Sequence, residues 1–376
     1  MDPSTCRALF PALGQGTFLN HAGIAPCSTR VAAAMQGVIA EQAQHGSGGY
    51  RRWTQLVAGV RRQAAALLGA GADEIAFVPN TSTGLSLVAE ALPWQAGDAV
   101  LVPVPDFPAN VYPWQHLARH GVELVSVPRR NGRLEPADVE RALVPGARLL
   151  ALSSVDYATG FSADLAAFGA FCRERGLLLV VDAIQSLGVR PLDVKRCGIH
   201  ALAAGAHKWL CGPQGIGLLY VDRTLLPRLA APLAGWKSVV DEEDFSLHFT
   251  LRGDAAVFEP GTLNLAGIAG LGAALDLLEE IGGEAVAARI QALTGELSDG
   301  LQARGWRVAG PWPAAERAGI VAFAGPAGSQ VLFRHLTAGG VTVARRDDRI
   351  RLSPHFANDA ADLARFFTLL ERCPRP

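Results

Sequence analysis

The stretch that decides the fold is LLLVVDAIQSLG, residues 177–188, together with ALAAGAHKWLCGPQGIGLLYV, residues 201–221. It contains three short apolar runs, at 177–182, 201–206 and 216–221, which do not alternate with polar residues. Strands that are apolar on both sides are typical of a sheet covered on both faces, as in parallel sheets. The stretch therefore predicts three buried strands of a largely parallel sheet.

The same kind of apolar run recurs upstream and alternates with helical patterns. The predicted strands are 75–79, 98–104, 122–127 and 148–155, and the helical patterns are 82–92, a segment ending at Arg119, 136–143 and 162–176. We expect Ser162 to cap the last of these helices and Gly176 to end it. The alternation predicts a doubly wound α/β domain with right-handed crossovers.

The pattern changes after Gly261. Two long helices are predicted there, followed by short strands and further helices: helices 264–282, 284–305, 330–337 and 359–371, and strands 320–324, 341–344 and 349–353. We therefore predict a large domain, 1–262, and a smaller C-terminal α+β domain, 263–376. The first 15 or so residues are expected to pack on the smaller domain.

Composition excludes several classes of protein. Of the 376 residues, 49% are apolar and 18% charged, which is enough apolar material for a large core and too little charge for a disordered chain. The net charge of −1 and the lack of like-charge blocks argue against a nucleic-acid partner. No apolar stretch is long enough to span a membrane, and no secretory signal is visible. The six cysteines form no CxxC pair, so we expect a cytoplasmic protein with reduced thiols and no metal site.

Three polar features lie where predicted strands end, and ligands of open α/β sheets bind outside the carboxyl ends of the strands. Asp182 ends the run 177–182, and Lys208, one of only three lysines, follows the run 201–206. The sequence NTSTG, residues 80–84, opens a helix whose N–H groups and hydroxyls suit a phosphate. Each feature also has a structural interpretation: Asp182 capping a turn, Lys208 reaching the surface, and Thr81 or Ser82 capping the helix.

Together, an amine, a carboxylate and an anion site fit pyridoxal phosphate (PLP). Its aldehyde needs a lysine, its ring nitrogen needs a carboxylate to stay protonated, and its phosphate needs hydrogen-bond donors. A lysine among apolar residues keeps a nucleophilic neutral amine, because burial disfavours its charged form. A nucleotide-binding α/β protein is the rival interpretation, and it would need the anion site but no lysine.

The chain resembles the class V aminotransferases, in the branch of cysteine desulfurase, isopenicillin N epimerase and kynureninase. The resemblance rests on VDAIQSLG, AAGAHKWLCGPQGIGLLYV, FLNHAGIAP and RIRLSPHFAN, and implies a PLP enzyme of fold type I. It implies that Lys208 is the Schiff-base lysine, Asp182 pairs with the ring nitrogen and Gln185 binds the phenolic oxygen. It also assigns the phosphate to His207 and to the turn of Thr81, Ser82 and Thr83.

The resemblance further implies that Phe107 stacks on the cofactor, unless it is a core aromatic, and that Arg351 binds the substrate α-carboxylate. Asn20 and His21 match the strand that lines the substrate pocket. Gly261 and Thr262 would reach the phosphate of a neighbouring subunit, which implies a homodimer. Either Asp156 or Tyr157 is expected beside the cofactor, and both Tyr50 and Trp236 beside the substrate. Three arginines are expected at the surface: Arg345, Arg346 and Arg349.

One departure from the family concerns the reaction. Cysteine desulfurases carry a cysteine shortly before the carboxylate-binding arginine, and residues 338–353 contain none. We therefore expect an enzyme acting at Cα of an amino acid, with transamination ranked first. The alternatives are a C–S or C–C β-lyase, an epimerase with His21 or Tyr50 as second base, and an inactive ligand-binding protein.

Overall fold

The large sheet consists of strands that are mostly apolar on both faces, except for an edge strand at 123–128 that is partly exposed. The computed structural model describes residues 3–325 and 328–373, and in them seven strands form this sheet. Their order across the sheet is β2 (Ile75–Val78), β8 (Gly217–Val221), β7 (Ala201–Gly205), β6 (Leu178–Asp182), β5 (Ala147–Ser153), β3 (Ala99–Val104) and β4 (Glu123–Pro128). Neighbouring strands from β7 to β4 pair in parallel, and only β8 runs against its two neighbours. The predicted doubly wound α/β fold is confirmed.

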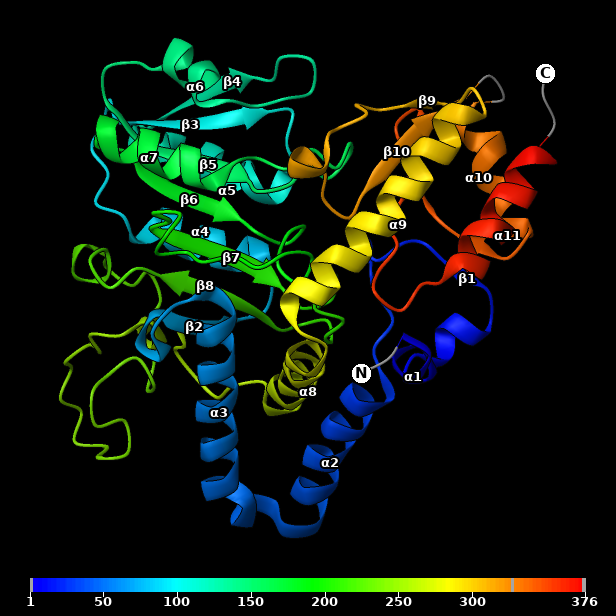
Figure 1. The fold of residues 1–376 in the computed structure, drawn as a ribbon. Helices are drawn as coiled ribbons and strands as arrows, with labels where there is room; N and C mark the ends of the chain where they lie inside the picture. Colours follow the sequence, from blue (N-terminus) through cyan, green and yellow to red (C-terminus); the bar gives the residue numbers. More distant parts are fainter. Residues whose placement is uncertain (1–2, 326–327, 374–376) are drawn as a thin grey trace.

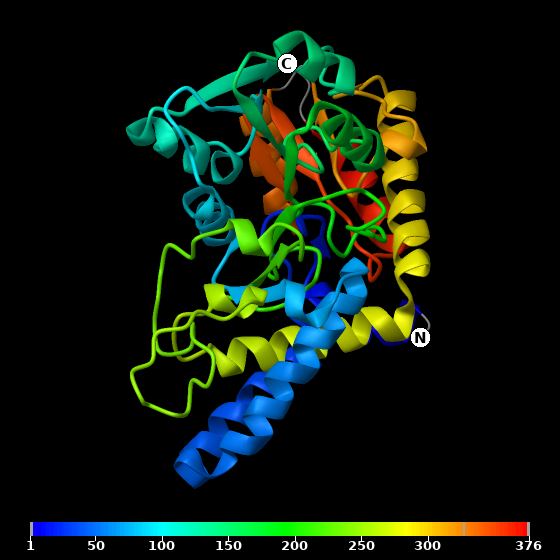
Figure 2. The same ribbon diagram turned by 90° about the vertical axis from the view of Figure 1, so that its left-hand side faces the viewer.

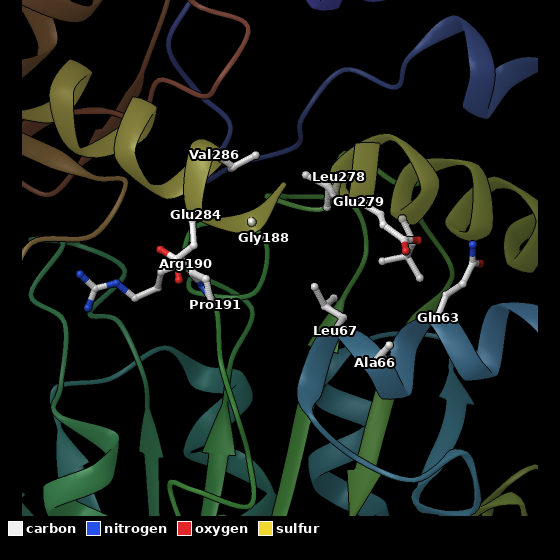
Figure 3. Close-up of a pocket in the computed structure, with 12 residues that line it drawn as sticks. Gln63, Ala66, Leu67, Gly188, Arg190, Pro191, Leu278, Glu279, Glu284 and Val286 are labelled. Carbon is white, nitrogen blue, oxygen red and sulfur yellow. The ribbon is translucent and has the colours of Figure 1, made fainter. Parts of the chain in front are cut away.

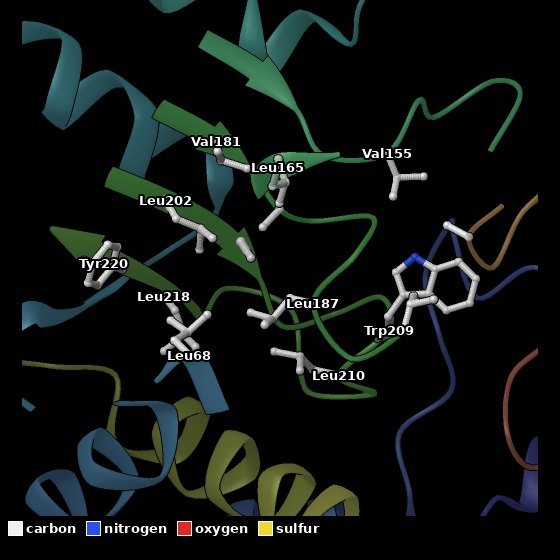
Figure 4. Close-up of a cluster of buried hydrophobic side chains, with 14 of the residues drawn as sticks. Leu68, Val155, Leu165, Val181, Leu187, Leu202, Trp209, Leu210, Leu218 and Tyr220 are labelled. Carbon is white, nitrogen blue, oxygen red and sulfur yellow. The ribbon is translucent and has the colours of Figure 1, made fainter. Parts of the chain in front are cut away.

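Each face of the sheet has its own apolar layer, because successive side chains of a strand point to opposite faces. On one face, Val181, Leu202 and Leu218 pack with Leu68 of α3 (Tyr50–Leu68), as Figure 4 shows. On the other face, Val180 and Leu219 belong to a second cluster with α4 (Thr81–Ala91) and α5 (Tyr112–His116). The sheet is therefore a central layer between two layers of helices.

Helices upstream of the sheet form a projecting hairpin that the sequence analysis did not predict. It consists of α2 (Thr29–His45) and α3 and extends away from the sheet in both views (Figures 1 and 2). The helix α8 (Leu265–Ile281) packs against both α2 and α3. Two shorter helices, α6 (Pro136–Ala142) and α7 (Leu165–Arg175), connect strands of the large sheet. Asp164, not the expected Ser162, caps α7, because its carboxylate accepts the N–H of Ala167; Gly176 ends the helix as predicted.

A smaller sheet lies in the C-terminal part, joined by the long helix α9 (Gly283–Ala303), which Figure 1 shows in yellow. Its strand order is β12 (Ala344–Arg346), β13 (Arg349–Leu352), β10 (Val321–Ala324) and β9 (Arg307–Val308), with α10 (Ser329–Ala338) and α11 (Ala360–Glu371) packed against it. The N-terminal segment reaches this part: β1 (Thr17–Phe18) pairs with β11 (Val341–Thr342), and Arg7 of α1 (Pro3–Ala8) pairs with Asp362. The division after residue 262 stays a prediction.

No helix in the described ranges is long and apolar enough to cross a membrane.

Candidate active site

A cavity of about 470 Å³ lies between the carboxyl ends of the large sheet and the hairpin of β12 and β13. It brings together residues from both sheets and from the N-terminal segment. Nine residues to which the family resemblance assigns a role line it: Asn20, Thr81, Ser82, Phe107, Asp182, Gln185, His207, Lys208 and Arg351.

Asp182 and Lys208 are the charged pair at the base of this cavity. Asp182 is the last residue of β6, is buried, and accepts the N–H of Ile184 at 2.9 Å, so it also closes the turn after the strand. Burial raises the pKa of Asp182 to about 7, with Asp106 adding to the effect and Lys208 opposing it. Burial also lowers the pKa of Lys208 to about 8, so its neutral amine is accessible near neutral pH.

Phe107 presents its ring to the cavity. It is 40% exposed, so it is not a core aromatic. The ammonium nitrogen of Lys208 lies 5.6 Å from the ring centroid, and Tyr157 meets the ring edge-on at 5.3 Å. Tyr157 lines the cavity, whereas the Asp156 carboxylate caps the turn of residues 156–159 by accepting from the N–H and hydroxyl of Thr159. Of the two residues that the sequence left open, Tyr157 is thus the one at the cavity.

The N-terminus of α4 faces the cavity with Thr81 and Ser82. Asn80 caps this helix, since its Oδ1 accepts the N–H of Thr83 at 2.9 Å; the expected caps Thr81 and Ser82 are already inside the helix. Thr83 does not line the cavity, and its hydroxyl donates to Asn80. Free N–H groups and hydroxyls at a helix N-terminus are suited to a phosphate, and His207 lies beside them.

Gln185 is held in place by two buried hydrogen bonds. Its Nε2 donates to the carbonyl of Ala22 at 3.2 Å, and its Oε1 accepts from the indole N–H of Trp209 at 2.8 Å. Trp209 follows Lys208 directly, so this bond also fixes the lysine segment. Gly188 allows the close approach: its φ is +94°, and a Cβ there would lie 2.5 Å from the carbonyl oxygen of Trp209.

Arg351 is buried on β13 and has free donors. Its Nη1 donates to the carbonyl of Tyr157 at 2.9 Å, while Nε and Nη2 are buried without a partner in the described residues. Burial and the like charge of Arg346 lower the pKa of Arg351. A buried guanidinium with two unpaired N–H groups is matched by a carboxylate in two-point contact.

The two N-terminal residues are placed differently. Asn20 lines the cavity, and its Oδ1 is buried without a partner in the described structure. His21 lies behind the cavity, with Nδ1 3.1 Å from the carbonyl of Ser353 and its ring 5.1 Å from that of His355. Burial lowers the pKa of His21, which makes it a neutral packing residue.

Four residues of the sequence analysis lie away from this cavity. Thr262, Tyr50 and Trp236 line a separate cavity of about 330 Å³, and Gly261 precedes Thr262 without lining either. Their predicted roles, in a neighbouring subunit or beside the substrate, stay predictions.

Arg346, which the sequence predicts at the surface, has a different position in the structure. Arg346 lines the cavity, whereas Arg345 beside it is exposed. The two occupy successive positions of β12, so their side chains take opposite faces. The alternation was the available signal, but only the register of the hairpin shows which arginine faces inward.

A further cavity of about 450 Å³ lies between α3, residues 188–191, α8 and the start of α9 (Figure 3). Gln63, Arg190, Glu279 and Glu284 are its polar residues, and none of the lysines reaches it. The described residues contain no cluster of histidine, cysteine and carboxylate side chains that would hold a metal.

The free donors and the carboxylate of the main cavity fit PLP. Asp182 would pair with its ring nitrogen, the N-terminus of α4 would hold its phosphate, and Lys208 would supply the amine for its aldehyde. Two unpaired N–H groups of Arg351 remain for an amino-acid carboxylate.

Comparison with known proteins agrees with this assignment. The family model of class-V aminotransferases matches residues 17–343. A probable cysteine desulfurase of Methanothermobacter thermautotrophicus is 32% identical over 287 residues, covering 75% of this chain and 71% of the relative. A cysteine desulfurase of Klebsiella pneumoniae subsp. pneumoniae is 35% identical over 340 residues, 84% of this chain and 81% of its own.

Solved structures show the same likeness. The apo cysteine desulfurase of Thermococcus onnurineus NA1 superposes with a TM-score of 0.91 at 25% identity, covering 99% of this chain and 98% of that one. The cystine C–S lyase C-DES, in complex with its product cysteine persulfide, gives a TM-score of 0.89 at 26% identity over 97% and 98% of the two chains. The architecture is that of fold type I, and PLP is the cofactor.

Proposed function

Because the chain belongs to the class-V aminotransferase family, we propose that it is a PLP-dependent lyase that cleaves the Cβ–S bond of a cysteine-derived amino acid. Its products would be a thiol, pyruvate and ammonia. The named relatives and structural neighbours support C–S cleavage better than the transamination that the sequence analysis ranked first.

The observation that carries the proposal is the lack of a sulfur acceptor in the cavity. All six cysteines lie in the described residues, and none lines the cavity. Where desulfurases carry their cysteine, this chain has the tight hairpin of β12 and β13, which turns at Asp347 and Asp348. The sulfur therefore leaves on the small product instead of being transferred to the enzyme.

The proposed roles follow from the site. When bound, PLP acts as an electron sink that makes the Cα–H bond of an amino acid acidic. Arg351 holds the α-carboxylate through Nε and Nη2 and so orients that bond. The amine of Lys208, with its lowered pKa, removes the α-proton.

Loss of the α-proton leads to cleavage of the Cβ–S bond. The electron pair of the Cα–H bond forms a double bond to Cβ, and the pair of the Cβ–S bond leaves with sulfur. Lys208 returns the proton to the sulfur, which departs as a thiol. Water converts the three-carbon remainder to pyruvate and ammonia.

Neither residue suggested as a second base for the epimerase alternative lines the cavity of its own chain. His21 is buried behind the cavity, and Tyr50 lies at another site, where its hydroxyl donates to Glu243. Neither His21 nor Tyr50 of the same chain is therefore placed to return a proton to the opposite face of Cα.

A homodimer forms part of the proposal. The segment 233–251 carries the most exposed apolar side chains of the described residues, with Phe245 at 75%, Leu247 at 95% and Phe249 at 70%. A second copy of this chain would cover such a patch. Gly261 and Thr262, which lie outside their own chain's cavity, would then be available to the partner's phosphate site.

The test is a product assay on the purified holoenzyme with L-cystine, L-cysteine and S-alkyl cysteines. We expect pyruvate in equal amount to the sulfur product, which is persulfide from cystine, hydrogen sulfide from cysteine and a thiol from S-alkyl cysteines, and no sulfur on the enzyme's own cysteines by mass spectrometry. Lys208→Ala is the control and should release neither. Conversion of the cofactor to its amine form, reversed by a keto acid and without pyruvate, would establish an aminotransferase instead.

A further inference from the structure

The hairpin of β12 and β13 carries four arginines with different surroundings. Arg345 is exposed, and Arg349 lies 3.6 Å from the carboxylate of Asp348. Arg351 is buried and hydrogen-bonded, as described above. Arg346 is half-buried and lines the cavity.

Arg346 has no acidic partner in the described part of the chain. Its one hydrogen bond there is from Nη1 to the backbone carbonyl of Arg345, at 2.8 Å. Arg346, Arg351 and Lys208 line the same cavity, and the charges of both arginines lower the pKa of Lys208. Among the residues that the structure describes, Asp182 is the only one with a carboxylate that lines the same cavity.

The guanidinium of Arg346 adds a positive charge that one amino-acid carboxylate does not need. Arg351 alone offers two free N–H groups to the α-carboxylate. The phosphate position is defined by the N-terminus of α4 and His207, on the large sheet, whereas Arg346 enters from the hairpin of the smaller sheet. Within one chain, a second anionic group of the ligand is the partner that remains for Arg346.

We propose that Arg346 determines substrate specificity by binding a carboxylate at the far end of the substrate side chain. On the proposed lyase function, on which this inference rests, the substrate class is that of cysteine S-conjugates or disulfides with a distal carboxylate. A planar guanidinium binds such a group in two-point contact, and burial strengthens the interaction.

The test uses two ligands that differ in one charge. The desamino compounds 3-(carboxymethylthio)propionate and 3-(carbamoylmethylthio)propionate have nearly the same shape, and neither can react because both lack the amino group. Calorimetry on the holoenzyme should show the acid binding at least tenfold more tightly than the amide. In Arg346→Gln and Arg346→Met the preference should fall to within about threefold.

Arg345→Gln is the matched control, because it removes the same charge from the next residue of the same strand and should keep the wild-type preference. Equal binding of acid and amide by the wild type would overturn the inference. An equal loss of affinity for both ligands in Arg346→Gln would also overturn it, since Arg346 would then share the α-carboxylate with Arg351. Thermal melting of Arg346→Gln and Arg346→Met should match that of the wild type, so that a loss of preference does not reflect misfolding.

A second readout separates this inference from the lyase proposal. Pyruvate release is compared for S-carboxymethyl-L-cysteine and S-carbamoylmethyl-L-cysteine, and Arg346→Gln should raise KM for the acid only. If binding discriminates but neither compound releases pyruvate, the lyase proposal fails while the role of Arg346 stands.

Discussion

Arg351 of the smaller sheet donates from Nη1 to the backbone carbonyl of Tyr157, 2.9 Å away, on the loop that follows β5 of the large sheet. This bond joins the two sheets at the edge of the cavity. The bond uses only Nη1 of the guanidinium and leaves Nε and Nη2 buried without a partner in the described residues. The group is thus held in place for a ligand at a cost to the stability of the free protein.

Replacing Arg351 should separate stability from binding. We expect Arg351→Met to unfold with a free energy equal to or about 1 kcal/mol above that of the wild type, since it removes a buried charge with unpaired donors. KM for amino-acid substrates should rise at least thirtyfold, about 2 kcal/mol. Thermal melts and steady-state kinetics measure both effects, and Arg351→Lys shows what charge without the planar fork retains. A strongly destabilised Arg351→Met would contradict the assignment.

The lowered pKa of Lys208 predicts a pH profile. The neutral amine predominates above the pKa of about 8 and is lost as the pH falls below it. Trapping of PLP on the cofactor-free protein by borohydride should therefore rise from pH 6, reach half its maximum near pH 8 and level off one to two pH units higher. Because Arg346 lowers this pKa, Arg346→Gln should move the profile to higher pH, whereas the neighbouring Arg345→Gln should leave it in place.

Peptide mapping makes the trapping experiment unambiguous, since the chain has only two other lysines, Lys195 and Lys237. The pyridoxyl group should appear on Lys208 alone. An inflection near the ordinary lysine value of about 10.4 would mean that the amine is not desolvated.

The bond between Trp209 and Gln185 predicts different effects for two tryptophans. Trp209→Phe leaves Oε1 of Gln185 buried without its donor and should destabilise the protein by about 1–3 kcal/mol. PLP should also bind several-fold more weakly, because the amide loses its orientation. Trp114→Phe is the matched control, since Nε1 of Trp114 is buried without a hydrogen-bond partner in the described structure. Equal losses of PLP affinity in the two variants, by equilibrium titration, would refute the positioning role of Trp209.

The proposed homodimer depends on the exposed apolar segment 233–251. Sedimentation velocity should show a dimer for the wild type, and the combined change of Phe245, Leu247 and Phe249 to serine should weaken association at least a hundredfold. Val331→Ser, on α10, removes another exposed apolar side chain and should leave the dimer intact. A wild-type monomer at micromolar concentration would rule out the shared site.

Local signals in the sequence account for the elements that were predicted well. The runs of β6, β7 and β8 are apolar at every position, so their burial follows whatever surrounds them. Asp182 is the last residue of β6 and Lys208 comes three residues after the end of β7, so both lie at the same edge of the sheet. Helix ends were predicted less well, because several neighbouring polar residues can serve as the cap. In the structure the N-caps are Asp164 instead of Ser162, and Asn80 instead of Thr81.

What the sequence by itself determined is the α/β fold with its large sheet, the PLP family and the positions of the lysine and the carboxylate at strand ends, because each follows from local stretches of the chain. Only the tertiary structure decided between neighbours such as Asn20 and His21, or Arg345 and Arg346. Successive residues of an extended segment point in opposite directions, and pairing with a distant strand sets which one faces the cavity: Asn20 beside Ser353, and β12 against β13. A single residue of register would exchange these roles, and no local pattern encodes it.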